Sequence, residues 1–336
     1  MTIDFVRAGR DPSERVKAQF PVLIDMFPKI IRQSQSLLPI TIVNRSVYTI
    51  YRKYCLINNF IYLPHVQGLE SHYILRTSII RSLDLNFQHM GPRFTPTQIE
   101  KLADKFEARS AQEVLKWALD TFGTKIGLAS SFGAEDVAII DMMTKIDRKK
   151  TKVFTLETGR LNQETYDVMD AIRARYGIQI EAYFPDQKKV EEMIRSKGMN
   201  LMYESVENRK MCCEIRKVHP LNRALSTLDG WMTGLRRDQV STRATTRKFE
   251  LDLAHGGIVK LNPIADWSSD MVWDYIHKNN IPYNALHDKG FPSIGCEPCT
   301  RAVQPGEDPR AGRWWWENAA AKECGLHFDP TKKKHK

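Results

Sequence analysis

The chain has 336 residues, of which 42% are hydrophobic and 27% charged, as is usual for a globular protein with a sizeable core. There is no apolar run of about eighteen residues, and the first residues mix charges of both signs. We therefore expect no membrane span and no secretory signal, and we predict a cytoplasmic protein.

The net charge of +10 favours anionic partners, from nucleic acid to a small phosphate ester. Residues 1–89 hold 11 basic and 6 acidic side chains, so half of the excess charge lies in this shorter part. The longer remainder is only weakly basic, which argues against a nucleic-acid-binding body. We expect neither nucleic acid nor a membrane among the partners.

Three parts are expected along the chain. Residues 1–90 carry no recognisable motif, and they are either an accessory extension or the result of a mis-assigned start, with translation beginning at Met90. Residues 91–303 are predicted to form the nucleotide-binding body. Residues 304–336 are punctuated by Gly and Pro, with one short helix near 317–322, and we expect a mobile catalytic tail.

Strand and helix patterns alternate through the body. Helices are expected after Gly133, from Gln163 to Tyr176, and after an N-cap at Ser268 or Ser269. Short apolar runs predict strands within 125–132, 151–158, 178–185, 230–234 and 257–264. This alternation predicts an α/β fold whose mostly parallel sheet is flanked by helices, with ligands beyond the carboxyl ends of the strands.

Polar, glycine-containing segments follow three of the predicted strands, at 130–136, 156–160 and 234–239. Small residues let backbone N–H groups approach an anion, and a following helix N-terminus adds a favourable dipole. The first segment is not a Walker motif, because no Lys-Ser/Thr pair follows its glycine. The candidate binding residues at these strand ends are Ser130, Ser131, Gly133, Glu135, Asp136, Thr158, Gly159, Gly234 and Arg236. Further cations that could neutralise a phosphate and a sulfate are Lys217, Arg237, Arg243 and Arg247.

Four of the six cysteines form two groups, Cys212-Cys213 and Cys296-x-x-Cys299. In a reducing compartment such groups indicate a metal or catalysis more often than disulfides. Four thiolates fit either tetrahedral zinc or an iron–sulfur cluster, and a redox pair at CxxC is a third interpretation. Because neighbouring side chains normally point apart, we expect a turned or strained backbone at Cys212–Cys213.

Cys324 stands apart from the four, in the segment Lys322–His327. A thiol attacks as thiolate when nearby cations lower its pKa, and Arg310 and Arg313 could do so. Cys324 is therefore the candidate nucleophile, whereas Cys55 is expected to be inert. For the three tryptophans at 314–316, we expect packing of the tail against the body.

These segments resemble the assimilatory adenylyl-sulfate reductases of the phosphoadenylyl-sulfate reductase family. The resemblance runs from about Phe94 to His327 and rests on SSFGAED (130–136), FTLETGRLNQETY (154–166), CCEIRKVHPL (212–221), GLRRDQVSTRA (234–244), SIGCEPCT (293–300), GRWWWE (312–317) and KECGLH (322–327). It implies an adenine-nucleotide alpha-hydrolase-like fold of the ATP-pyrophosphatase type.

The resemblance also implies a chemistry. Cys324 would take the sulfonyl group of adenosine 5′-phosphosulfate as an S-sulfocysteine and expel AMP, and thioredoxin or glutaredoxin would release sulfite, in sulfate assimilation and cysteine biosynthesis. Because no redox domain follows Cys324, the reductant is expected to be a separate protein. A 4Fe-4S cluster is implied on Cys212, Cys213, Cys296 and Cys299. The residues implied to hold the phosphosulfate are Lys217, Arg243, Arg310, Arg313 and His327. A homo-oligomer is left open.

Three alternatives are weighed against this interpretation. One is reduction of the 3′-phosphorylated substrate by the same mechanism, which we rank second because Glu135 and Asp136 are expected to repel a further phosphate. Another is an ATP-pyrophosphatase-type adenylating enzyme, such as a tRNA-thiolating one. Such an enzyme would have a phosphate-binding loop of the SGGxDS type, which the SFGAED of this chain matches poorly. The third is a zinc-stabilised nucleic-acid-binding protein, suggested by the pI of 9.2.

Overall fold

The computed structural model describes residues 94–317, all of which belong to one unit, His89–Lys336. The predicted extension 1–90 lies outside the described residues. So do the candidate nucleophile Cys324, its neighbour His327, and all but the first residue of the short helix expected near 317–322. Within the described residues, no helix is both long and apolar enough to span a bilayer.

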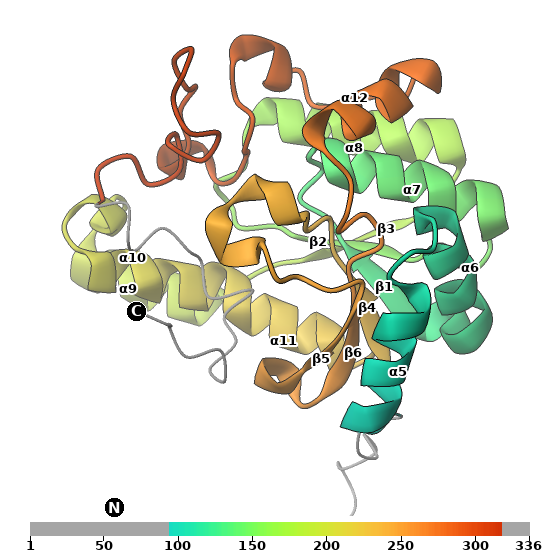
Figure 1. Ribbon diagram of the computed structural model, residues 1–336. Coiled ribbons are helices and arrows are strands. Elements are labelled where there is room, and N and C mark those ends of the chain that lie inside the picture. Colours follow the sequence, from blue (N-terminus) through green and yellow to red (C-terminus); the bar gives the residue numbers. More distant parts are fainter. Residues whose placement is uncertain (1–93, 318–336) are drawn as a thin grey trace, which may run out of the picture. The chain divides into compact units, whose positions relative to one another are not determined.

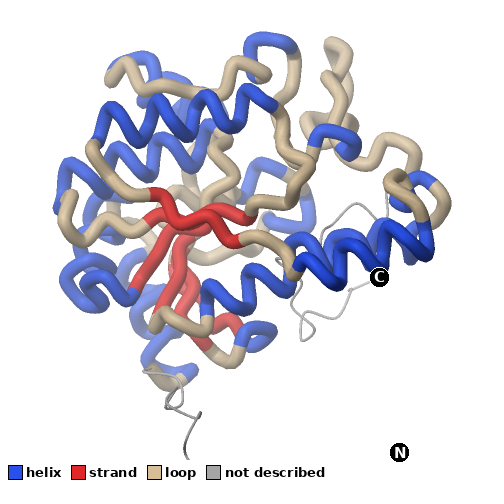
Figure 2. Tube along the Cα trace, turned by 180° about the vertical axis from the view of Figure 1, so that it is seen from behind, coloured by secondary structure: helices blue, strands red, loops and turns tan. Residues whose placement is uncertain are grey.

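A six-stranded sheet lies at the centre of the described residues, between two layers of helices (Figures 1 and 2). The strand order is β3-β2-β1-β4-β6-β5, and every neighbouring pair is parallel except β5 with β6. This confirms the predicted mostly parallel α/β sheet. The strands are β1 (Ile126–Ala129), β2 (Val153–Leu156), β3 (Ile180–Tyr183), β4 (Gly230–Met232), β5 (Phe249–Asp252) and β6 (Ile258–Leu261).

Two hydrophobic cores cover the two faces of the sheet. The larger joins Leu128 and Met232 of the strands to α5, α6, α7, α8 and α12, and the smaller packs Phe154 and Trp231 against α11. The helices are α5 (Pro96–Phe106), α6 (Ala111–Phe122), α7 (Ala134–Asp147), α8 (Gln163–Tyr176), α9 (Gln187–Lys197), α10 (Val206–Cys213), α11 (His219–Leu225) and α12 (Ser269–Lys278).

Local signals in the sequence explain where several helices begin and end. Helix α6 begins at a capping box, in which Ser110 and Glu113 satisfy each other's backbone N–H groups. Helix α8 ends at Gly177, which has the left-handed conformation (φ +60°) that favours glycine. Helix α12 is capped by Ser268, whose side chain accepts from the N–H of Met271. These ends agree with the expectations for α8 and α12.

The sheet topology fixes where a ligand can bind. The strand order runs one way from β1 to β3 and the other way from β4 to β6, so the crossovers diverge between β1 and β4. At such a switch point the loops after the two strands separate and leave a crevice at the carboxyl edge. The loop after β1 begins at Ser130 and the loop after β4 at Thr233, so both meet at this crevice.

Candidate functional site

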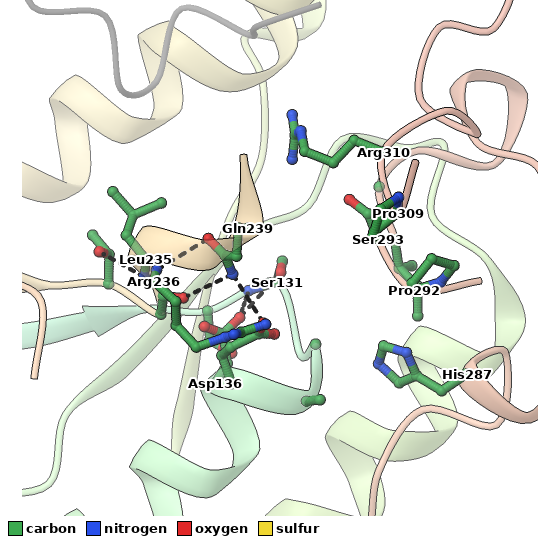
Figure 3. A pocket seen from close by; sticks show the side chains of 18 of the residues that line it. Ser131, Asp136, Leu235, Arg236, Gln239, His287, Pro292, Ser293, Pro309 and Arg310 are labelled. Carbon is green, nitrogen blue, oxygen red and sulfur yellow. Dashed lines mark hydrogen bonds and ion pairs between the residues drawn. The ribbon is translucent and has the colours of Figure 1, made fainter. Parts of the chain in front are cut away.

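A cavity of about 860 Å³ opens at the carboxyl edge of the sheet, between the loops that follow β1, β2 and β4 (Figure 3). Nearly all of the predicted binding residues within 94–317 line it. They are Ser130, Ser131, Gly133, Glu135, Asp136, Thr158, Lys217, Gly234, Arg236, Arg243, Arg310 and Arg313. Gly159 does not line the cavity; it takes a left-handed turn (φ +70°) beside Arg216, which donates to the carbonyl of Thr158 at 2.6 Å.

The loop after β1 is held in shape by its own hydrogen bonds. The N–H and the hydroxyl of Ser131 donate to Asp136 at 2.7 and 3.0 Å, and the N–H of Phe132 donates to Ser130 at 3.0 Å. Phe132 is fully buried with φ +58°, a conformation rare for a bulky side chain. Since two of the loop's N–H groups are already engaged, an anion at this loop depends on the following N–H groups, which begin at Gly133.

Asp136 is buried beneath this loop and is only 6% exposed. Burial, followed by repulsion from Glu135, raises the pKa of Asp136 from 3.8 to about 6. Gly234 passes directly over it, because a Cβ at this glycine would lie 2.7 Å from Oδ1 of Asp136 and 2.8 Å from Cβ of Glu135. Glycine at 234 is therefore needed for the close approach of the β4 loop to α7.

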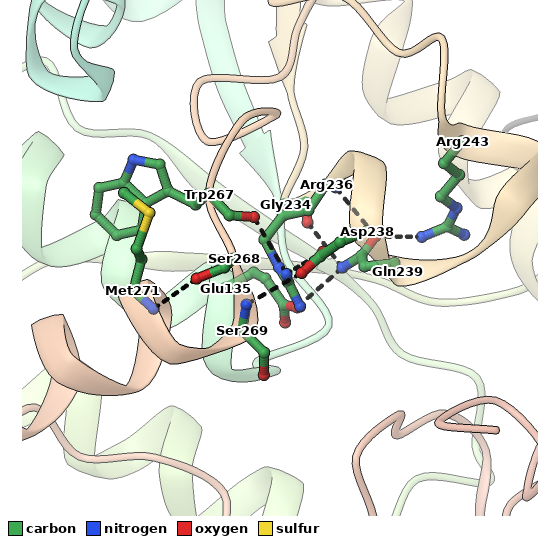
Figure 4. A network of polar contacts seen from close by, with 10 residues as sticks. All are labelled: Glu135, Gly234, Arg236, Asp238, Gln239, Arg243, Trp267, Ser268, Ser269 and Met271. Carbon is green, nitrogen blue, oxygen red and sulfur yellow. Dashed lines mark hydrogen bonds and ion pairs between the residues drawn. The ribbon is translucent and has the colours of Figure 1, made fainter. Parts of the chain in front are cut away.

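Glu135 organises two of the predicted cations (Figure 4). Its carboxylate accepts from Arg236 at 3.0 Å and from the side chain of Gln239 at 2.9 Å. Gln239 in turn accepts from Arg243 at 2.6 Å. Arg236 also pairs with Asp238, whose other oxygen accepts from the N–H of Ser269 at the start of α12. The negative charge of Glu135 is thus largely compensated by Arg236.

Two of the candidate cations lie elsewhere. Arg237 pairs with Glu107, and Arg247 pairs with Asp104, so both attach the loop segment 237–247 to α5 rather than facing the cavity. The interpretation that these two arginines neutralise a bound phosphate or sulfate therefore gains no support from the structure. No local signal in the sequence distinguished them from Arg236 and Arg243, which line the cavity.

The four predicted cysteines lie together around a second, smaller cavity. Each is between 7% and 9% exposed, and all four line this cavity with several cations. Three of them, Cys213, Cys296 and Cys299, share a hydrophobic cluster with Trp314. The cations lining this chamber are Arg160, Arg209, Arg216, Lys217 and Arg313. The positive lining offsets the charge of several thiolates in one small space.

Backbone geometry at the adjacent cysteines differs from the expected strained turn. Cys213 has ordinary α-helical angles (φ −64°, ψ −39°) as the last residue of α10. The irregularity comes one residue later, as a π-helical turn at Glu214–Val218. Such a turn widens the helix and changes the direction of the side chains that follow. It carries Lys217 to a position where it lines both the large cavity and the cysteine chamber.

The four cysteines can be compared with the ligand sets that a zinc ion and an iron–sulfur cluster require. In tetrahedral zinc, Zn–S bonds of about 2.3 Å hold the sulfurs about 3.8 Å apart. Within residues 94–317, no three His, Cys, Asp or Glu side chains are arranged to hold one metal ion. A multi-iron cluster with one iron per thiolate holds its ligands farther apart. The indole N–H of Trp314 is buried without an acceptor in the described part of the chain, as a donor facing a cluster sulfur would be.

Thiolate character differs among these cysteines. Burial alone would raise the pKa of Cys296, but the charge of Lys217 and the hydrogen bond with Thr158 hold it below its usual value. The distance from Thr158 Oγ1 to Cys296 Sγ is 3.3 Å. Burial, together with the charge of Cys296, raises the pKa of Cys299 to about 11. The environment therefore stabilises an anionic sulfur more strongly at Cys296 than at Cys212 or Cys299, whose pKa values are raised.

The two cavities share part of their walls. Lys217, Arg313 and Trp314 line both of them, so cations that face the large cavity also face the sulfurs. Residues 304–317 of the predicted tail run along this boundary, where Trp314 is 1% exposed and Trp315 is 39% exposed. The expected packing of tail tryptophans against the body is therefore confirmed for Trp314.

Sequence reasoning did not select two residues of this region. Gln239 was part of a quoted motif, but nothing in its position indicated that it connects Glu135 with Arg243. Arg209 forms an ion pair with Glu317, which lies 108 residues away in the sequence. No local pattern marks a contact of that kind, so only the fold could reveal it.

Fold and site together define a doubly wound α/β protein with a cavity lined by cations at the switch point of its sheet, beside a group of four cysteines. Residues 125–302 match the family model of the phosphoadenosine phosphosulfate reductase domain. The chain belongs to this family.

Several relatives extend this finding. Adenosine 5′-phosphosulfate reductase of Burkholderia cepacia is 51% identical over 208 residues, which cover 61% of this chain and 81% of the relative. Chloroplastic 5′-adenylylsulfate reductase 3 of Arabidopsis thaliana is 42% identical over 271 residues, 78% of this chain but only 57% of the plant protein.

A solved structure agrees with the fold. Phosphoadenylyl-sulfate reductase from Candida auris, solved as a phosphate complex, is similar with a TM-score of 0.55 and 28% sequence identity. The match covers 64% of this chain and all of that one. It supports the predicted fold class.

Proposed function

We propose that this protein reduces adenosine 5′-phosphosulfate to sulfite and AMP, with Cys324 as the nucleophile. The observation that carries this proposal is the shared wall of the two cavities, in which Lys217 and Arg313 face both the anion-binding space and the four cysteines. The names of the relatives that are 42% and 51% identical support the same reaction.

The substrate carries one phosphate and one sulfate, and the cavity offers cations at both ends of such a group. Arg236 and Arg243 stand beside the β4 loop, and Lys217, Arg310 and Arg313 line the side toward the cysteines. A thiolate approaches an anionic sulfonyl group only where fixed cations offset the charge of its oxygens. We assign the phosphosulfate to this second group, together with His327.

The proposed reaction transfers a sulfonyl group and then reduces it. The thiolate of Cys324 attacks the sulfonyl sulfur, a sulfur–sulfur bond forms, and the sulfur–oxygen bond to AMP breaks with its electron pair leaving on the phosphate. A thiolate of a dithiol protein of the thioredoxin or glutaredoxin class then attacks the sulfur of Cys324, and sulfite leaves. The second thiol of that protein resolves the mixed disulfide, so the reductant ends as a disulfide. This requires a compartment that keeps thiols reduced, such as the cytoplasm expected from the sequence.

We assign Cys212, Cys213, Cys296 and Cys299 as ligands of a 4Fe-4S cluster. Such a cluster would supply an electrostatic and structural role, joining the segment that bears Lys217 to the loop that bears Cys296. Thr158, whose hydroxyl lies 3.3 Å from Cys296 Sγ, and Trp314, whose buried indole N–H has no acceptor within residues 94–317, would donate hydrogen bonds to sulfur atoms of this site.

The sequence suggested that Glu135 and Asp136 repel a 3′-phosphate and so favour the substrate that lacks one. Glu135 is paired with Arg236, and Asp136 is buried and accepts hydrogen bonds from Ser131, so both carboxylates already have partners within the protein. Repulsion by these two residues is therefore a weak reason to exclude a 3′-phosphate. The four-cysteine set and the naming of the relatives support adenosine 5′-phosphosulfate.

One experiment tests the reaction and the substrate together. Anaerobically prepared full-length protein is supplied with reduced thioredoxin and either substrate, sulfite is measured, and iron and sulfide are determined on the same sample. We expect sulfite from adenosine 5′-phosphosulfate with a kcat/KM at least about ten-fold above that for the 3′-phosphorylated compound. No sulfite from either substrate would contradict the proposal, and the opposite preference would favour the 3′-phosphorylated substrate.

A further inference from the structure

A buried ion pair joins the cysteine-bearing helix to the end of the described chain. Arg209 on α10 donates to both carboxylate oxygens of Glu317, at 2.8 and 2.7 Å. The two side chains are only 1% and 2% exposed. A bidentate arginine–carboxylate pair of this kind fixes both the position and the orientation of its partners.

Trp314 strengthens the same contact. The guanidinium groups of Arg209 and Arg313 lie 4.6 and 4.9 Å from the centre of its indole ring. The backbone N–H of Trp314 donates to the carbonyl of Cys299 at 3.2 Å, and the backbone N–H of Glu317 donates to the carbonyl of Trp314 at 2.9 Å. Trp314 has φ +43°, an uncommon conformation for a bulky residue, which persists only where the surroundings fix it.

These contacts lie close in the sequence to the candidate nucleophile. Glu317 precedes Cys324 by seven residues, whereas Arg313 precedes it by eleven and Thr300 by 24. Seven residues span at most about 25 Å when fully extended, so the point at which the chain is held limits where Cys324 can travel.

We propose that Arg209 and Glu317 are a positioning pair, which holds the start of the Cys324 segment against the cysteine-bearing helix so that the thiolate is delivered to the substrate cavity. This inference rests on the proposed function, because it assigns the pair a role in the attack by Cys324. Neither residue touches the reacting atoms. Their effect is on how often the thiolate reaches the sulfonyl sulfur.

Glu317→Gln removes the negative charge that faces the buried guanidinium of Arg209, which weakens the hold on this segment. Small displacements of a reacting group slow its reaction steeply. Glu317→Gln is therefore expected to slow adduct formation on Cys324 by about two-fold or more at saturating substrate.

The test uses the full-length, iron-containing protein in a single turnover without reductant, with the adduct on Cys324 followed by mass spectrometry. Trypsin cleavage after Arg313, a residue only 6% exposed, reports release of the segment independently of activity. In Glu317→Gln we expect slower adduct formation, faster cleavage after Arg313 and unchanged iron content. A matched control is Glu307→Gln, which removes an ion pair with Arg301 in the same segment. Both side chains of that pair are about one-third exposed. This variant should change neither the rate of adduct formation nor the rate of cleavage after Arg313.

A second variant separates anchoring from charge. Replacing both partners, as in Arg209→Met with Glu317→Leu, leaves an apolar contact in place of the ion pair, which is often tolerated where single replacements are not. We expect this double variant to recover resistance to trypsin cleavage after Arg313.

Three results would overturn the inference: wild-type adduct rate and trypsin resistance in Glu317→Gln, a double variant cleaved after Arg313 as fast as the single one, or iron lost in parallel with the rate. If the wild type itself forms no adduct, the proposed function fails and so does the delivery of Cys324. The cleavage measurement would then still show whether the pair anchors the segment.

Discussion

The guanidinium group of Arg313 lies flat against the backbone of Gly295, the residue that precedes Cys296 in the sequence. A Cβ at position 295 would lie 2.7 Å from Nη1 of Arg313, so no other residue leaves room for the arginine. Nη1 also donates to the carbonyl of Ile294 at 3.1 Å. The loop that bears Cys296 therefore also fixes a cation that lines the large cavity.

Gly295→Ala should displace Arg313 and weaken substrate binding. Losing one cation that holds an anionic oxygen costs about 1.5–3 kcal/mol, so we expect KM to rise by about ten-fold or more with iron content retained. Steady-state kinetics with iron analysis checks this. Since both changes remove the same contact, the double variant Gly295→Ala/Arg313→Ala should be no worse than Arg313→Ala alone. Additive losses would show that the glycine acts by another route.

Asp136 should make stability depend on pH in a defined direction. Its pKa is raised from 3.8 to about 6, so as the pH rises from about 4 to 6 the unfolded chain ionises more readily than the folded one. Stability is therefore lost over this window, by about 3 kcal/mol in total, and it stays lost above it. Asp136→Asn keeps an acceptor for Ser131 and removes the ionisation.

Calorimetry of the wild type and Asp136→Asn at pH 5 and pH 8 measures this effect. The melting temperature of the variant relative to the wild type should be higher at pH 8 than at pH 5. An equal difference at both values would mean that Asp136 does not titrate in this window.

Cys299→Ser should remove iron, visible colour and most of the activity together, because four thiolates are assigned to one cluster. Cys55→Ser is the matched control and should change none of these. Iron and sulfide analysis with visible absorption spectroscopy checks the result. Retention of full iron by the Cys299 variant would contradict the assignment of this residue as a ligand.

Much of the fold could be predicted from local pattern. The strands β1, β2, β3, β4 and β6 are short apolar runs, and the helices between them carry caps or glycine ends. Strand β5 was not predicted, although Phe249–Asp252 alternates apolar and charged residues, because a run of only four residues is a weak signal. It becomes a strand by antiparallel pairing with β6. That pairing brings together segments whose register no local signal sets.

Site residues could be predicted from the sequence where reactive side chains occur at a recognisable spacing. The four cysteines were grouped from their spacing, and the fold brings them to one chamber. The cations could not be sorted in this way, because no motif told the cavity-lining Arg236 and Arg243 from Arg237 and Arg247, which pair with acidic residues of the α5 region. Contacts between distant segments, such as Arg209 with Glu317, depend on tertiary packing and leave no trace in a local pattern.

The central claim is that Cys324 takes the sulfonyl group of the substrate. The most direct measurement is mass spectrometry of peptides from iron-containing protein treated with adenosine 5′-phosphosulfate in the absence of reductant. We predict that the peptide bearing KECGLH gains the mass of one sulfonate group, that reduced thioredoxin removes it, and that Cys324→Ser abolishes it. A peptide of unchanged mass, while the same protein releases sulfite from the substrate, would contradict the account.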